Sequence, residues 1–123
     1  MNKCYRELLV WQKAMDLVIE CYKCTRDFPK HETFGLASQL QRAIVSVPSN
    51  IAEGNERGNP KEFLHYLRIA SGSLAEAETQ IEISFRLNYI NQSARDFLLA
   101  NCEEVGRMLG GLRKNIQRKI DSL

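Results

Sequence analysis

The sequence predicts an all-α protein, an antiparallel up-down-up-down four-helix bundle. Apolar residues recur at steps of three and four along four long segments, and no segment alternates with the period of a strand. Proline, glycine and asparagine, which end helices, lie between the segments. Helices of about 20 to 28 residues joined by short loops favour antiparallel neighbours. At 123 residues, the chain is expected to form a single domain over residues 1–123.

The first two helices are predicted over residues 8–27 and 33–57. The Phe28-Pro29 step separates them, because a residue before proline disfavours the helical conformation. Pro48 lies inside the second helix and has no N–H for the carbonyl group four residues earlier, which predicts a kink or break near Pro48. The core stripe of the first helix is expected to comprise Leu8, Trp11, Met15, Val18, Tyr22 and Thr25.

The third helix is predicted over residues 60–87. Asn59 can cap its first turn, Pro60 suits the first helical position, and Asn88 can stop it in a left-handed conformation. One broad apolar face is expected to fill the core. That face comprises Phe63, Tyr66, Leu67, Ala70, Leu74, Ala77, Ile81 and Phe85.

The opposite side of the third helix also carries apolar residues. These are Ile69, Gly72, Ile83 and Leu87, with His65, Glu76 and Gln80 between them. A monomeric bundle normally presents a polar side to water here, so we expect Ile69, Gly72, Ile83 and Leu87 to form a subunit interface. The alternative is a set of scattered surface apolar residues, which is common in monomers.

The fourth helix is predicted over residues 92–120, opened by Asn91 or Ser93. Its core stripe comprises Leu98, Cys102, Val105, Leu109, Leu112 and Ile116. Glycine inside a helix costs about 1 kcal/mol relative to alanine. The glycines inside the third and fourth helices therefore indicate close approach of another helix, and they are Gly72, Gly106, Gly110 and Gly111.

Polar residues follow one line of the second helix at the border of its apolar stripe. Buried polar groups are costly unless paired, which predicts a hydrogen-bond network with polar residues of the third helix. The expected members are Ser46, Asn50, Glu53, Arg57, Ser71, Ser73 and Glu76. Gly54 allows close backbone approach there. The catalytic alternative lacks a second carboxylate on this line, a nearby histidine and a glycine loop for phosphate, so we expect no catalytic residues.

The net charge of +2 is too small to indicate a nucleic-acid partner by itself, but the charge is unevenly distributed. Residues 105–120 contain five basic and no acidic residues, whereas residues 71–85 contain three glutamates and no basic residue. Arg107, Lys114 and Arg118 fall on one outward line of the fourth helix and are candidates for nucleic-acid contact.

That basic line has an alternative interpretation. It can be a solvated helix face on which Glu103 pairs with Arg107 at a spacing of four residues.

Cysteine usage and hydropathy exclude other classes. No apolar run approaches the roughly 20 residues that span a bilayer, and the first residues do not resemble a signal peptide, so we expect a cytoplasmic protein without a membrane partner. Cys21 and Cys24 form a C-x-x-C pair, but it lies inside a helix and without paired further ligands. We expect reduced thiols, no metal and no cofactor.

The chain resembles a bacterial four-helix-bundle family, the 23S rRNA intervening-sequence proteins. The resemblance rests on LVWQKAMDLV (9–18), FGLASQLQRAIVSVPSNIAEG (34–54), EFLHYLRIASGSLAEAET (62–79) and GRMLGGL (106–112). It implies a ring-like homopentamer, and it assigns no catalytic residues. A more distant similarity is to the accessory protein of diversity-generating retroelements, a basic pentamer that associates with a reverse transcriptase and nucleic acid. The chain departs from the family pattern at Gln41, where relatives often have a basic residue, and at Ala77 and Asn88.

Together these observations predict a non-enzymatic homo-oligomer, expected to be a pentamer, that binds RNA, DNA or a ribonucleoprotein. Repetition of a basic surface around a ring would multiply weak phosphate contacts. The alternative is a scaffold that binds a partner protein and has no direct nucleic-acid role.

Overall fold

The computed structural model describes residues 4–123, which form four α-helices and two short 3₁₀ helices. In chain order the elements are η1 (Tyr5–Glu7), α1 (Leu9–Thr25), η2 (Lys30–Glu32), α2 (Leu36–Glu56), α3 (Pro60–Arg86) and α4 (Gln92–Asp121). The predicted all-α four-helix fold is confirmed, and no strand occurs within the described residues.

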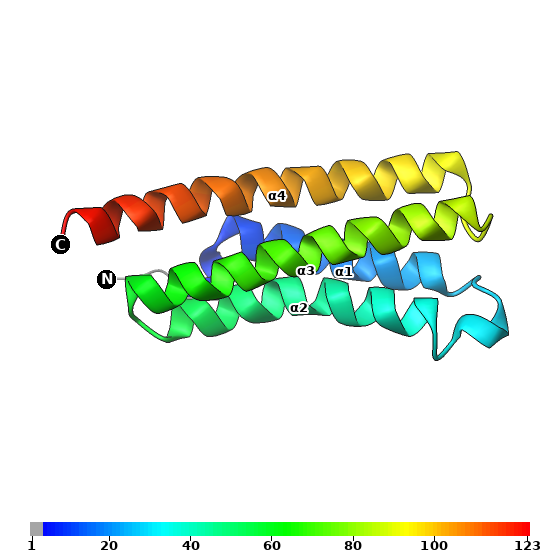
Figure 1. Ribbon diagram of the computed structural model, residues 1–123, viewed down its shortest axis with the longest axis horizontal. Coiled ribbons are helices and arrows are strands. Elements are labelled where there is room, and N and C mark those ends of the chain that lie inside the picture. Colours follow the sequence, from blue (N-terminus) through cyan, green and yellow to red (C-terminus); the bar gives the residue numbers. More distant parts are fainter. Residues whose placement is uncertain (1–3) are drawn as a thin grey trace.

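The four helices lie side by side, and the chain reverses direction at each connection between them (Figure 1). Each helix packs against its neighbours in the sequence, and α1 also packs against α4. The bundle therefore closes around a single core, which extends along all four helices.

The core stripe predicted for α1 is confirmed at Thr25, which is buried, but most of its other positions are wrong by about one residue. Val10, Ala14, Leu17 and Cys21 are buried, whereas Met15 is 39% exposed. Tyr22 is also exposed, and Trp11 and Val18 only flank the core. The reason is that α1 carries two adjacent apolar stripes with the same steps of three and four, so periodicity alone does not distinguish the stripe that faces α2 and α4.

Helix α2 starts later than predicted and continues through Pro48. The Glu32 carboxylate accepts a hydrogen bond from the N–H of Leu36 at 3.1 Å, which satisfies a donor at the start of the helix. Pro48 is buried inside an unbroken helix, so the predicted break is wrong, while the kink stays a prediction. Proline removes only one backbone donor, and the remaining hydrogen bonds together with packing against the core keep the turn helical.

Asparagines lie at both ends of α3 and at the start of α4. Asn59 accepts hydrogen bonds from the backbone N–H groups of Lys61 and Glu62 at 2.9 and 3.2 Å. Asn88 follows α3 with a φ of 63°, the expected left-handed stop. Asn91 accepts from the N–H of Ala94 at 2.8 Å, so Asn91 rather than Ser93 caps α4.

The buried side of α3 is wider than predicted. Gln80 was expected on the outer face, but it is 5% exposed, and Ser84 is fully buried. Helix α3 packs between α2 and α4, so residues at the edges of its apolar face are covered by one neighbour or the other. The Gln80 side-chain amide donates to the Glu76 carboxylate at 3.4 Å, and its Oε1 atom has no hydrogen-bond partner within the described part of the chain.

The glycines inside helices differ in their surroundings. A Cβ on Gly54 would lie 2.6 Å from Tyr66 Cβ, so α2 and α3 approach closely at this point. Gly106 has ordinary packing space beside α3, at 3.5 Å from a Leu74 methyl group. Gly72 and Gly111 face open space in the single chain, so the close approach predicted for them does not occur within it.

Candidate functional site

A hydrogen-bonded polar cluster joins the middle of α2 to α3. The hydroxyl oxygens of Ser46 and Ser73 are 2.8 Å apart, and the Asn50 amide donates to both the backbone carbonyl and the hydroxyl of Ser46, each at 2.8 Å. Ser71 contributes no bond, because its buried hydroxyl has no partner among residues 4–123. With two hydroxyls and one amide, the cluster contains no ionisable group that could act as an acid or base.

The charged residues predicted for the same network lie apart from it. Arg57 donates to the Glu53 carboxylate at 3.0 Å and to the Tyr66 hydroxyl at 2.9 Å, and both charged side chains are exposed. Within residues 4–123, the Glu76 carboxylate accepts a side-chain hydrogen bond only from Gln80. Each i to i+4 step advances one helical turn, so Glu53 and Arg57 are two and three turns beyond Ser46, near the end of α2 where solvent reaches them.

The four residues predicted as a subunit interface are all accessible in the single chain. Ile69 is 39% exposed, Ile83 41% and Leu87 49%, and Gly72 presents bare backbone. An apolar stripe of this length on the side of α3 away from the core exposes hydrophobic surface that a partner could cover.

Ile83 also lines an open groove between the second half of α3 and the start of α4. The groove has a volume of about 520 Å³ and is lined by both apolar and charged side chains. Its lining residues are Glu78, Thr79, Glu82, Ile83, Arg86 and Leu99. We refer to it as the α3–α4 groove.

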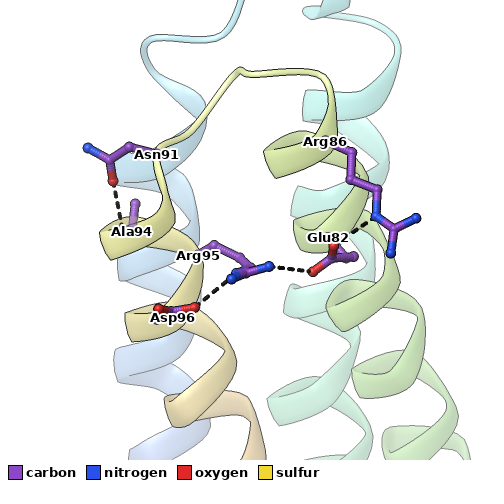
Figure 2. A network of polar contacts seen from close by, with 6 residues as sticks. All are labelled: Glu82, Arg86, Asn91, Ala94, Arg95 and Asp96. Carbon is purple, nitrogen blue, oxygen red and sulfur yellow. Dashed lines mark hydrogen bonds and ion pairs between the residues drawn. The ribbon is translucent and has the colours of Figure 1, made fainter.

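A network of charged side chains includes two residues that line this groove, Glu82 and Arg86. Figure 2 shows Arg95 between Asp96 and Glu82, with Arg86 on the other side of Glu82. The guanidinium of Arg95 also lies 4.1 Å from the centroid of the Phe85 ring, a cation–π contact. The hydrogen bond from Arg86 lowers the pKa of the Glu82 carboxyl, and the nearby charge of Arg95 lowers it further. Partial burial acts in the opposite direction but is outweighed. Glu82 is therefore an anion with its own partners.

Glu78 in the same groove has no cationic partner among the described residues. Partial burial, followed by the nearby Glu103 carboxylate, raises the pKa of the Glu78 carboxyl. A cation delivered by another molecule would stabilise this charge.

Basic residues gather where α3 begins and α4 ends. Arg68, Arg113 and Lys114 line a shallow groove of about 180 Å³ together with Leu64 and Gln117. The Nε atom of Arg113 is buried and has no hydrogen-bond partner within residues 4–123. Arg68 was not singled out by the sequence pattern, because it comes from a different helix than the predicted basic line.

The three residues predicted to contact nucleic acid differ in whether they form ion pairs. Arg107 donates to Glu103 at 2.9 Å, so its charge is already paired. Lys114 and Arg118 are exposed, and neither makes an ion pair with any described residue. Lys114 and Arg118 are therefore the part of the predicted line whose charges are not paired within residues 4–123.

A second apolar groove lies on the other side of the bundle, against α1 and α2. It has a volume of about 410 Å³. Its lining comprises Tyr5, Trp11, Met15, Val18, Val45, Pro48, Ser49 and Ala52. This groove contains the outer stripe of α1 that the sequence pattern had assigned to the core.

The thiols, the potential metal ligands and the hydropathy of the helices add three observations. Cys21 and Cys102 are buried, and burial raises the pKa of the Cys102 thiol to about 12. No group of three potential metal ligands comes together within the part of the chain that is described. No helix in residues 4–123 is both long and apolar enough to cross a membrane.

The family of 23S rRNA-intervening sequence proteins matches residues 6–111 of the chain. The chain belongs to this family. The match covers α1, α2 and α3 completely and all of α4 except its last turns. No curated protein matches this intervening-sequence protein.

Solved structures match the chain as well. One is a protein of unknown function from the S23 ribosomal protein family of Bacteroides thetaiotaomicron. Its TM-score to the intervening-sequence protein is 0.78 at 22% identity, and the match covers 86% of this chain and 99% of that one. At this identity the likeness shows a shared fold and nothing about activity.

Proposed function

We propose that this intervening-sequence protein is a non-enzymatic cytoplasmic homo-oligomer, with five subunits as the expected number, that binds RNA or DNA through a basic surface. The observation that supports it most is the basic groove of Arg68, Arg113 and Lys114, which joins α3 to the basic end of α4. Family membership makes a nucleic-acid context plausible without assigning an activity.

The chemistry of the basic groove suits phosphate. Arg113 has a buried Nε donor with no partner in residues 4–123, and an unpaired buried donor is costly unless a ligand satisfies it. Arginine binds phosphate oxygens through parallel N–H groups, and Lys114 and Arg118 can add positive charge beside it. A phosphodiester backbone is therefore the ligand that this surface favours.

Assembly would strengthen this binding. The exposed stripe of Ile69, Gly72 and Ile83 supplies apolar surface for a neighbouring copy. In a ring each copy adds another basic groove at a fixed spacing, so weak contacts act together on one polymer.

Binding should be measured by fluorescence anisotropy with single-stranded RNA and DNA over a range of salt concentrations. The double variant Lys114→Gln/Arg118→Gln should weaken binding and reduce the salt slope by roughly 1 for each lost phosphate contact. Lys23→Gln is a control on α1, where Lys23 is paired with Glu20. Absence of binding at low salt, or an equal loss in the control, would contradict the nucleic-acid proposal.

Oligomerisation is tested by analytical ultracentrifugation. Ile69→Lys should dissociate the assembly, whereas Leu123→Lys at the exposed C-terminus should leave it intact. A wild-type chain that sediments as a monomer at high micromolar concentration would refute assembly.

The second candidate function is a scaffold for a partner protein, and the groove of Trp11, Met15 and Val45 favours it. An amphipathic helix of a partner could place its apolar side there. Capture of the same protein from nuclease-treated lysate by wild-type chain, and its loss with Met15→Glu, would favour the scaffold over nucleic-acid binding.

A further inference from the structure

Phe34 is the most exposed large apolar residue of the described chain. Its side chain is 97% accessible, in the connection between η2 and α2. A phenylalanine side chain that is this exposed contributes no burial energy to the stability of its own chain, because an aromatic side chain stabilises a fold when it is removed from water.

The segment that carries Phe34 is nevertheless held firmly. The Tyr89 hydroxyl donates to Glu32 at 2.8 Å, and the same carboxylate accepts from the N–H of Leu36 at 3.1 Å. The Tyr89 ring also lies 5.4 Å from that of Phe28. These contacts fix the chain on both sides of Phe34, so the ring is presented to solvent by a pre-organised segment, which lowers the entropy cost of binding.

We infer that Phe34 anchors the contact between copies of this chain by entering the α3–α4 groove of the adjacent subunit. The inference deepens the assembly proposed above and depends on it. It assigns one specific side chain and one specific receiving surface, neither of which follows from the exposed stripe on α3 alone.

Size and position support this pairing. The α3–α4 groove has about 520 Å³, and apolar cavities of about 150 Å³ already accept a benzene ring. Phe34 and the groove lie toward the same end of the bundle, because Glu32 and Tyr89 join the α1–α2 connection to the α3–α4 connection there (Figure 1). Rotation about an axis parallel to the bundle keeps each residue at its height, so a ring of this kind would bring Phe34 level with a neighbour's groove.

Charge complementarity selects the same surfaces. Lys30, four residues before Phe34, is exposed and makes no ion pair with any residue in 4–123. In the groove Glu78 has no cationic partner within residues 4–123, whereas Glu82 pairs with Arg86 and Arg95. Lys30 of one copy can therefore pair with Glu78 of the next as Phe34 enters.

The contact is heterologous, because the donor segment and the receiving groove belong to different surfaces. Each subunit then uses its own Phe34 on one side and its own groove on the other. This property gives a direct test with complementary variants.

Phe34→Ala should weaken self-association about thirtyfold or more in sedimentation velocity experiments, as expected for a central aromatic anchor. Thr79→Trp, which fills the groove from its own exposed rim, should weaken it similarly. Leu123→Ala removes another highly exposed apolar side chain and should change nothing. Unchanged far-UV circular dichroism spectra would show that all three variants fold.

Mixing the two defective variants provides the decisive measurement. Phe34→Ala retains an intact groove and Thr79→Trp an intact Phe34, so the mixture should form one-to-one dimers at a concentration where each variant alone is monomeric. If the wild-type chain assembles and Phe34→Ala assembles equally well, or if the mixture stays monomeric, the inference is wrong while the proposed assembly stands. A monomeric wild-type chain would overturn both.

Discussion

The close approach of α2 and α3 at Gly54 allows a quantitative test of the fold. Replacing Gly54 by alanine adds a Cβ that would lie 2.6 Å from Tyr66 Cβ and 3.1 Å from a ring carbon of Phe63, whereas ordinary contacts begin at 3.4 Å. Tyr66 Cβ is bonded directly to the backbone, so a change of rotamer does not relieve the overlap. The two helices must move apart.

The expected cost follows from two opposing effects. Overpacking a well-filled contact costs about 1–3 kcal/mol, and the rigid neighbour favours the upper part of that range. Alanine improves on glycine in a helix by about 1 kcal/mol. Gly54→Ala should therefore lower the free energy of unfolding by about 1–2 kcal/mol. Gly111→Ala is the matched control, because nothing lies within 4 Å of its new Cβ, and it should gain up to about 1 kcal/mol.

Both variants should be measured by urea denaturation with far-UV circular dichroism. All samples need one protein concentration, because association stabilises the folded state. If Gly54→Ala is as stable as the wild-type chain while Gly111→Ala is stabilised, the α2–α3 contact is looser than described and the reasoning fails.

Three further predictions concern polar groups and thiols. Asn50→Ala removes the two hydrogen bonds that the Asn50 amide donates to Ser46 within α2 and should cost about 1–2 kcal/mol in the same assay, and an unchanged stability would contradict this. Hydrogen bonds from the backbone N–H of Leu36, and then from the Tyr89 hydroxyl, lower the pKa of the Glu32 carboxyl. The stability that Glu32 contributes is therefore present above its unfolded pKa of about 4.3 and is lost as the pH falls through the folded pKa. Tyr89→Phe should therefore reduce the loss of stability on acidification, and an identical pH profile would count against the contact. Burial raises the pKa of the Cys21 thiol far above its usual range, so a disulfide reagent should modify exposed Cys4 quickly and Cys21 only in urea.

The sequence predicts the features that depend on neighbouring residues. Asn59 and Asn88 have the local chemistry to begin and end α3, and the structure uses both in that way. The stripe on α4 is unambiguous, because only one face of that helix repeats apolar residues, and it forms the core except for the half-buried Leu112.

Features that depend on distant residues were not predicted. The two apolar stripes on α1 match the helical period equally, and only packing against α2 and α4 selects the one with Ala14 and Cys21. Arg68 and Arg113 are far apart in the sequence and meet only because α3 and α4 run beside each other. Phe34 resembles an ordinary apolar residue at a helix start until the structure leaves it uncovered.

The order of helices around the core has a consequence for synthesis of the protein. Among the four α-helices, every contact joins two that are consecutive in the chain, apart from that of α1 with α4. A topology so rich in local contacts favours rapid folding. Because translation produces α4 after the other three α-helices, the nascent chain keeps part of its apolar interior open until α4 leaves the ribosome, and closure of the bundle is the step at which aggregation competes.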